Sequence, residues 1–209
     1  MSWRAHVLSI SAMGAFALGG SPPVLTAQHC IPVVRGDRNT AMADLLRAGL
    51  PWHPDSGAHV FATLPLDALG HVAVLLATVP NQVGEFAAVA GSDSVCGLVG
   101  TLSHYALDPN YARDTVPWNA AIASAAPGFS IAIPADARRV GLAALAYFIF
   151  RMPIDSNVVT ASARWDGHGW NVSGAMNLGG RRLFFLRILP DGRIRTIFCQ
   201  DPGDPPDSN

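Results

Sequence analysis

The chain has 209 residues, half of them hydrophobic, and a formal net charge of -1. Its length and apolar content are sufficient for a substantial core and predict one domain or two small subdomains. A net charge near zero provides no basic field for a polyanion, so we expect no nucleic-acid partner. Only 14% of the residues are charged, which excludes a largely disordered chain.

The N-terminal segment has the order of a secretory signal. Arg4 precedes an uncharged apolar run, Val7 to Leu18, and small residues and two prolines follow it. The run is shorter than the roughly 20 residues that span a bilayer. We therefore predict a signal peptide over residues 1–27, although cleavage near Gly19 or Gly20 also fits and a buried N-terminal helix is the other interpretation. The mature protein is expected to be periplasmic or secreted, with no membrane span.

Three cysteines, Cys30, Cys96 and Cys199, lie beyond the apolar run. In an oxidising compartment two of them would form a disulfide and leave one thiol over. Cys96 and Cys199 fall on predicted strands of the two halves, so we predict that they pair and that Cys30 is the odd thiol. Three buried, inert thiols are the alternative. The sequence contains no Cys-x-x-Cys, and it therefore offers no redox motif or zinc knuckle.

The second half predicts a helix followed by an antiparallel meander. The helix, about 134–150, has Asp136 near its start, where a carboxylate complements the helix dipole. Period-two alternation and turn signals predict strands at 158–165, 170–177, 183–189 and 193–200. The strand at 183–189 is apolar on both faces, so we expect it to be the most buried. The fold class is therefore α+β, with a meander over about 157–200 packed by the preceding helix.

The first half repeats this order more weakly. Asn39 or Thr40 can cap a helix over 41–47, and strand candidates follow at 58–64, 71–79, 85–90 and 95–102. The chain is thus a single α+β domain over 28–200, or two subdomains, 39–102 and 134–200, joined by 103–133. That connection contains one short predicted helix at 118–126, and residues 201–209 are typical of a disordered tail.

No catalytic motif emerges from the sequence. Residues 24–30 (VLTAQHC) are similar to the surroundings of the general-base His in chymotrypsin-like proteases, but the glycine-rich nucleophile string of that family is absent. Ser92-Asp93-Ser94 lacks the glycines that form an oxyanion hole. His53 and His59 flank Asp55 without a second dense ligand pair nearby. We therefore predict neither a metal nor a cofactor.

Trp165 and Trp170 flank the turn of one predicted hairpin, next to Arg164. Alternation makes the two indoles a cross-strand pair, which either closes the sheet edge or forms a binding surface for a sugar ring, a peptide or a protein. Our leading hypothesis is an exported, non-enzymatic protein that binds a protein or small ligand through its sheet face or middle loop, with Trp165, Trp170 and Arg164 as binding residues. The alternative is a secreted hydrolase that uses His, Asp and Ser residues of the loops near 52–59 and 91–104.

Overall fold

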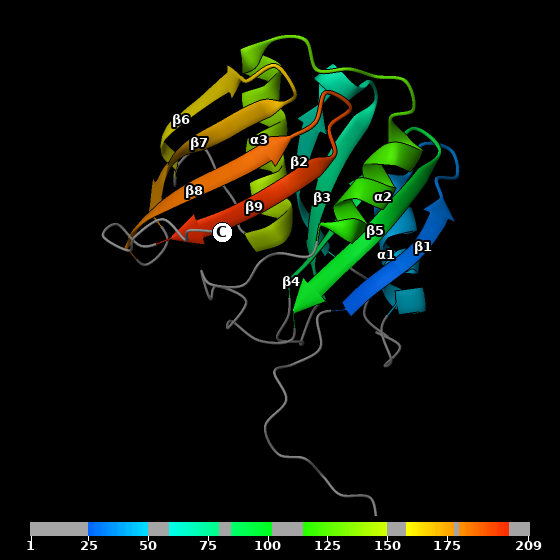
Figure 1. Cartoon of the computed structure of the whole chain (residues 1–209). Helices are drawn as coiled ribbons and strands as arrows, with labels where there is room; N and C mark the ends of the chain where they lie inside the picture. Colours follow the sequence, from blue (N-terminus) through cyan, green and yellow to red (C-terminus); the bar gives the residue numbers. More distant parts are fainter. Residues whose placement is uncertain are drawn as a thin grey trace, which may run out of the picture.

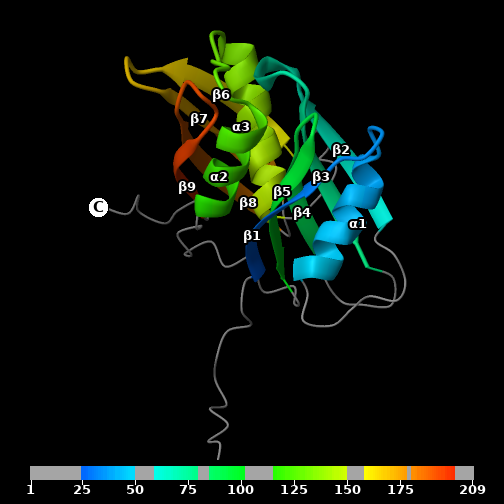
Figure 2. The ribbon, with the colours of Figure 1, turned by 90° about the vertical axis from the view of Figure 1, so that its right-hand side faces the viewer.

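The structure, a computed structural model, describes residues 25–49, 59–79, 85–101, 115–149, 158–177 and 180–200. Within these ranges two antiparallel β-sheets and three α-helices are stacked in layers (Figures 1 and 2). The predicted α+β class is therefore confirmed. None of the helices in these ranges has the length and apolar character needed to cross a membrane.

Sheet A has five strands in the order β1-β5-β4-β3-β2. They are β1 (Leu25–Pro32), β2 (His59–Leu66), β3 (Val72–Thr78), β4 (Glu85–Ala90) and β5 (Ser94–Thr101). The meander from β2 to β5 corresponds to the four strands predicted for the first half. β1 is an addition: it pairs antiparallel with β5, with Ile31 opposite Val95. Its first residues fall inside the predicted signal peptide, and its sequence has no sustained alternation to mark a strand.

Sheet B is the meander predicted for the second half. Its strands β6 (Val158–Trp165), β7 (Trp170–Asn177), β8 (Arg181–Ile188) and β9 (Ile194–Gln200) follow one another in sequence order. Each strand is antiparallel to the next. β8 is therefore a central strand, and β6 and β9 form the edges.

Two hydrophobic clusters hold the layers together. On one face of sheet A, α1 (Arg38–Gly49) packs Met42, Leu45 and Leu46 against residues of β3, β4 and β5. On the other face lie α2 (Val116–Ala125) and α3 (Pro134–Ile149). Figure 2 shows the resulting sequence of layers: α1, sheet A, the α2 and α3 helices, and sheet B. Because α3 lies between two sheets, most of its circumference is apolar.

The cap of α1 differs from the prediction. Asp37, rather than Asn39 or Thr40, precedes the helix and accepts the backbone N–H of Thr40 at Oδ1, 3.0 Å away. The Thr40 hydroxyl donates to the other carboxylate oxygen at 2.6 Å. That side-chain hydrogen bond is the main cause that lowers the pKa of Asp37 below its ordinary value. Aspartate is thus the N-cap, and Thr40 is the third helical residue that completes it.

The most buried strand is not the one predicted. All residues of β3 from Val72 to Ala77 are buried, because α1 covers one side of sheet A and α3 covers the other. In β8 only alternate residues are buried: Phe184, Leu186 and Ile188 point toward α3, and the residues between them are half-buried. The expectation that 183–189 is the most buried strand is therefore wrong. No described helix packs on the side of sheet B opposite α3.

Candidate functional site

The β6–β7 hairpin brings Trp165 and Trp170 together. Their ring centroids are 5.3 Å apart and their planes meet at 60°. Trp170 is only 5% exposed, and its indole N–H donates to the carbonyl oxygen of Ile131 at 3.2 Å. Trp165 is 43% exposed. The hairpin therefore presents one accessible indole that rests on a buried, hydrogen-bonded one.

Arg164 lies on the opposite side of the sheet from this Trp pair. Its cross-strand neighbour is Asn171, whereas Trp165 is opposite Trp170. Successive residues of a strand point to opposite faces, and the buried Trp170 and Val172 mark the face that contacts α3. The structure thus brings the two indoles together and places the exposed Arg164 side chain on the side of sheet B that points away from α3.

Asp166 organises the turn between the two indoles. Its Oδ1 accepts the backbone N–H groups of His168 and Gly169, each at 3.0 Å. Its Oδ2 accepts the side-chain amide of Asn171 at 3.1 Å and pairs with the Arg187 guanidinium at 2.8 Å. The hydrogen bond from the His168 backbone is the main cause that lowers the pKa of Asp166. One ionised carboxylate therefore joins the turn to β7 and β8.

We call the face of sheet B that points away from α3 the outer face. The register of the strands, counted from the buried residues that contact α3, defines its members, of which Ala175 is itself buried. They form three rows across the sheet: Thr160, Ala175, Leu183 and Gln200; Ser162, Ser173, Phe185 and Phe198; and Arg164, Asn171, Arg187 and Thr196.

An aromatic pair lies on this outer face. Phe185 of β8 is directly opposite Phe198 of β9, and their rings are stacked with centroids 4.8 Å apart and planes 19° apart. Phe198 is 37% exposed and Phe185 is half-buried. Sequence reasoning missed this pair because the run around Phe185 is apolar on both faces. The alternation in β9 could have indicated it, because Phe198 directly follows the buried, inward-facing Ile197 and must therefore face outward.

The charged side chains of the outer face are basic. Arg164 and Arg187 occupy one row, and Arg181 extends the outward series of β8 beyond Leu183. Arg164 and Arg181 are exposed, and Arg187 is partly exposed beside Asp166. The outer face therefore combines apolar rings with guanidinium groups, and Asp166, the carboxylate that the described residues place beside it, is paired with Arg187.

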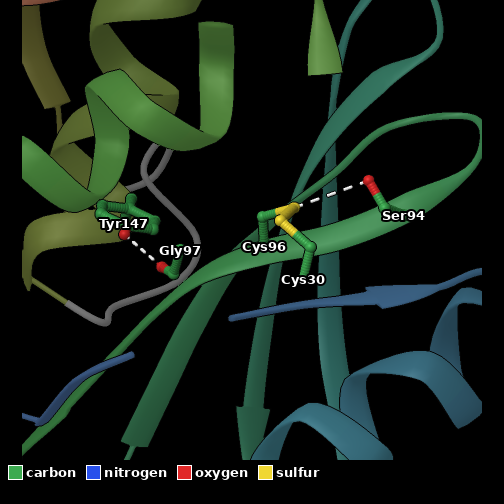
Figure 3. The surroundings of a disulfide bond; sticks show 5 residues. All are labelled: Cys30, Ser94, Cys96, Gly97 and Tyr147. Atoms are coloured by element: carbon green, nitrogen blue, oxygen red, sulfur yellow. Dashed lines mark hydrogen bonds between the residues drawn. A yellow bond between two sulfur atoms is a disulfide. The ribbon is translucent and has the colours of Figure 1, made fainter. Parts of the chain in front are cut away.

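The disulfide joins Cys30 to Cys96 within sheet A (Figure 3). The two residues are directly opposite on β1 and β5, with Cα atoms 4.3 Å apart. Opposed residues of an antiparallel pair can come this close, which brings the two sulfurs within bonding reach. The predicted Cys96–Cys199 pair is therefore wrong: Cys199 lies on β9 of sheet B and is outside the bridge. The prediction failed because the sequence did not indicate β1, the strand that carries Cys30, the disulfide partner of Cys96.

The residues of the hydrolase hypothesis are not brought together in the described chain. His53, Asp55 and His104 lie outside the described residues. His59 is exposed at the start of β2, and Asp93 is exposed in the turn before β5. Among the residues that the structure describes, no cluster of His, Cys, Asp and Glu could hold a metal ion.

Comparisons with models of known protein families, with curated proteins and with solved structures found no match.

Proposed function

We propose that this chain is an exported, non-enzymatic protein that binds a peptide segment of a protein partner on the outer face of sheet B. The observation that carries the proposal is the stacked Phe185–Phe198 pair, whose rings lie on a sheet face rather than in the core. Aromatic side chains gain most from burial at an interface, and exposed apolar patches mark binding surfaces.

The arrangement of the layers supports this surface. Helices pack on both faces of sheet A, whereas α3 packs on one face of sheet B. A segment that lies across the outer face would cover Phe198 and come within reach of Arg164. The half-exposed Trp165, supported by Trp170, is at the end of the same sheet and would extend the contact beyond the outer face.

The export part of the proposal rests on the N-terminal pattern and on the Cys30–Cys96 disulfide, which suits an oxidising compartment. Because β1 begins at Leu25, cleavage near Gly19 or Gly20 would leave the strand whole, and cleavage after Ala27 would shorten it. Mass spectrometry of the protein recovered from the periplasm of an expression host should therefore find a chain that begins near Ser21. An intact chain retained in the cytoplasm would contradict export.

The binding part can be tested with a random-peptide display library selected on the wild-type protein. Selected peptides should bind the Phe198→Ala variant about tenfold more weakly, a loss of about 1.4 kcal/mol. Phe61→Ala is the matched control, because Phe61 of β2 is 39% exposed but lies on sheet A. Selected peptides that bind both variants equally, or no enrichment at all, would contradict the proposal. The Trp165→Ala variant shows whether the hairpin contributes to the contact.

A further inference from the structure

We infer that the segment bound on the outer face of sheet B is acidic, with carboxylates on either side of an apolar or aromatic centre. This inference rests on the proposed function and names the chemistry of its partner. It starts from one strand, β8, whose outward side chains are Arg181, Leu183, Phe185 and Arg187 in that order.

The outward series of β8 therefore has a guanidinium at each end and apolar side chains between them. Arg181 and Arg187 lie roughly 20 Å apart along the strand, at about 3.3 Å per residue. An extended segment that lies over the outer face along β8 has the same rise per residue and the same alternation. Two carboxylates at that spacing, with outward apolar residues between them, would meet both arginines and the Phe185–Phe198 pair together.

The neighbouring charges favour the same partner. Arg164 lies in the same cross-strand row as Arg187, and the described carboxylate near them, Asp166, accepts three hydrogen bonds and forms an ion pair with Arg187. A carboxylate brought by a partner would thus meet the exposed Arg164 guanidinium and, at Arg187, would share the guanidinium with Asp166. The small Ser162 and Ser173 side chains, in the row of the Phe pair, leave room for a peptide backbone on the β6–β7 side.

Two other occupants fit less well. A second copy of the chain, pairing face to face about a two-fold axis, would bring the arginines of one outer face against those of the other. A single-stranded nucleic acid would stack its bases on open ring faces, but Phe185 and Phe198 already stack on each other. The net charge of -1 also provides no general attraction for a polyanion.

The test is a fluorescence-polarisation titration with the labelled peptide Asp-Ser-Leu-Ser-Phe-Ser-Asp. A peptide with Lys in place of both Asp residues and a labelled oligothymidine serve as the other probes. We expect the Asp peptide to bind the wild-type protein in a salt-dependent manner and the Lys peptide to bind at least about tenfold more weakly. The Arg181→Glu variant should lose about tenfold in affinity for the Asp peptide. Arg138→Glu, an equal change of charge at an exposed position of α3, should not.

Three results would overturn the inference: equal losses in Arg181→Glu and Arg138→Glu, equal binding of the Asp and Lys peptides, or preferential binding of the oligothymidine. The Phe198→Ala variant separates this inference from the proposed function. Peptide binding that depends on Phe198 but not on Arg181 would overturn the acidic partner and leave the binding surface in place. Peptide binding that depends on neither residue would overturn both.

Discussion

The side-chain amide of Asn119 exchanges two hydrogen bonds with the backbone of Ile194. Its Nδ2 donates to the Ile194 carbonyl at 2.9 Å, and its Oδ1 accepts the Ile194 N–H at 2.6 Å. A residue on a neighbouring antiparallel strand would make the same pair of bonds. The adjacent Trp118 donates its indole N–H to the Gly192 carbonyl at 2.9 Å. Through these contacts α2, which packs on sheet A, also holds the first residue of the edge strand β9.

Replacing Asn119 with Ala should lower the free energy of unfolding by about 1–3 kcal/mol, because both backbone groups of the buried Ile194 lose their partner. Urea unfolding measures that change. Ser124→Ala, at an exposed position of the same helix, is the control and should change stability little. Hydrogen exchange at the Ile194 amide should accelerate in the Asn119 variant, and an unchanged exchange rate would contradict the role assigned to Asn119.

Phe184 and Phe185 are adjacent on β8 but face opposite sides, and their replacement should have unequal effects. Phe184 is 0% exposed in the core beneath α3, so Phe184→Ala should cost about 3–5 kcal/mol. Phe185 is half-buried and keeps one ring partner, Phe198, so Phe185→Ala should cost roughly 1–2 kcal/mol. Chemical denaturation of the two variants gives the comparison. Equal losses would mean that a further segment covers the outer face.

The disulfide should account for two of the three cysteines. Thiol titration of the denatured, unreduced protein should detect the thiol of Cys199 alone, and the Cys199→Ser variant should give no signal. The Cys30→Ser variant should be less stable by about 4 kcal/mol in the chain-entropy model, because the bridge closes a loop with a sequence separation of 66. A Cys96–Cys199 peptide in a digest of the unreduced protein would refute the pairing.

The elements that the sequence predicts well are those whose signals are local. The strands of sheet B alternate in polarity and are separated by turn residues, and α3 is an apolar run followed by Pro153. β1 could not be identified in this way, since the strand it pairs with in the described sheet, β5, lies far along the chain. The disulfide prediction failed with it, because Cys30 becomes the neighbour of Cys96 only when β1 is placed.

The candidate site shows the same limit. Alternation predicts that Trp165 pairs with Trp170. It does not predict that only Trp170 is buried, because the Trp170 indole N–H donates to the carbonyl of Ile131, a residue of the distant connection between α2 and α3. The Phe185–Phe198 pair requires two facts that no local pattern contains: which face of β8 lies against α3, and which residue of β9 stands opposite Phe185. An apolar run on both faces of a strand is compatible with a covered strand and with a binding surface.

Acid should weaken the β6–β7 hairpin through Asp166. Its carboxylate accepts backbone N–H groups and pairs with Arg187, and the His168 N–H is the main cause that lowers the pKa of Asp166 below its ordinary value of 3.8. A carboxyl group whose pKa is lower in the folded than in the unfolded state stabilises fully above its unfolded pKa. It loses that contribution as the pH falls through the folded pKa. The stabilisation by Asp166 should therefore be complete at neutral pH and should decrease progressively as the pH falls below about 4.

Urea unfolding of the wild type and of Asp166→Ala, from about pH 7 down to about pH 3, tests this expectation. The difference in free energy of unfolding between the two proteins should be constant down to about pH 5 and should shrink as the carboxylate takes up its proton. Asp166→Asn is the matched variant, because it keeps an acceptor oxygen for the His168 and Gly169 N–H groups but removes the charge that faces Arg187. At neutral pH the free energy of unfolding of Asp166→Asn should differ from that of the wild type by less than that of Asp166→Ala does. This difference should also shrink over the same pH range. The free energy of unfolding could instead change with pH by the same amount in the wild type and in both variants. That result would show that the ionised carboxylate contributes nothing to the stability of the hairpin.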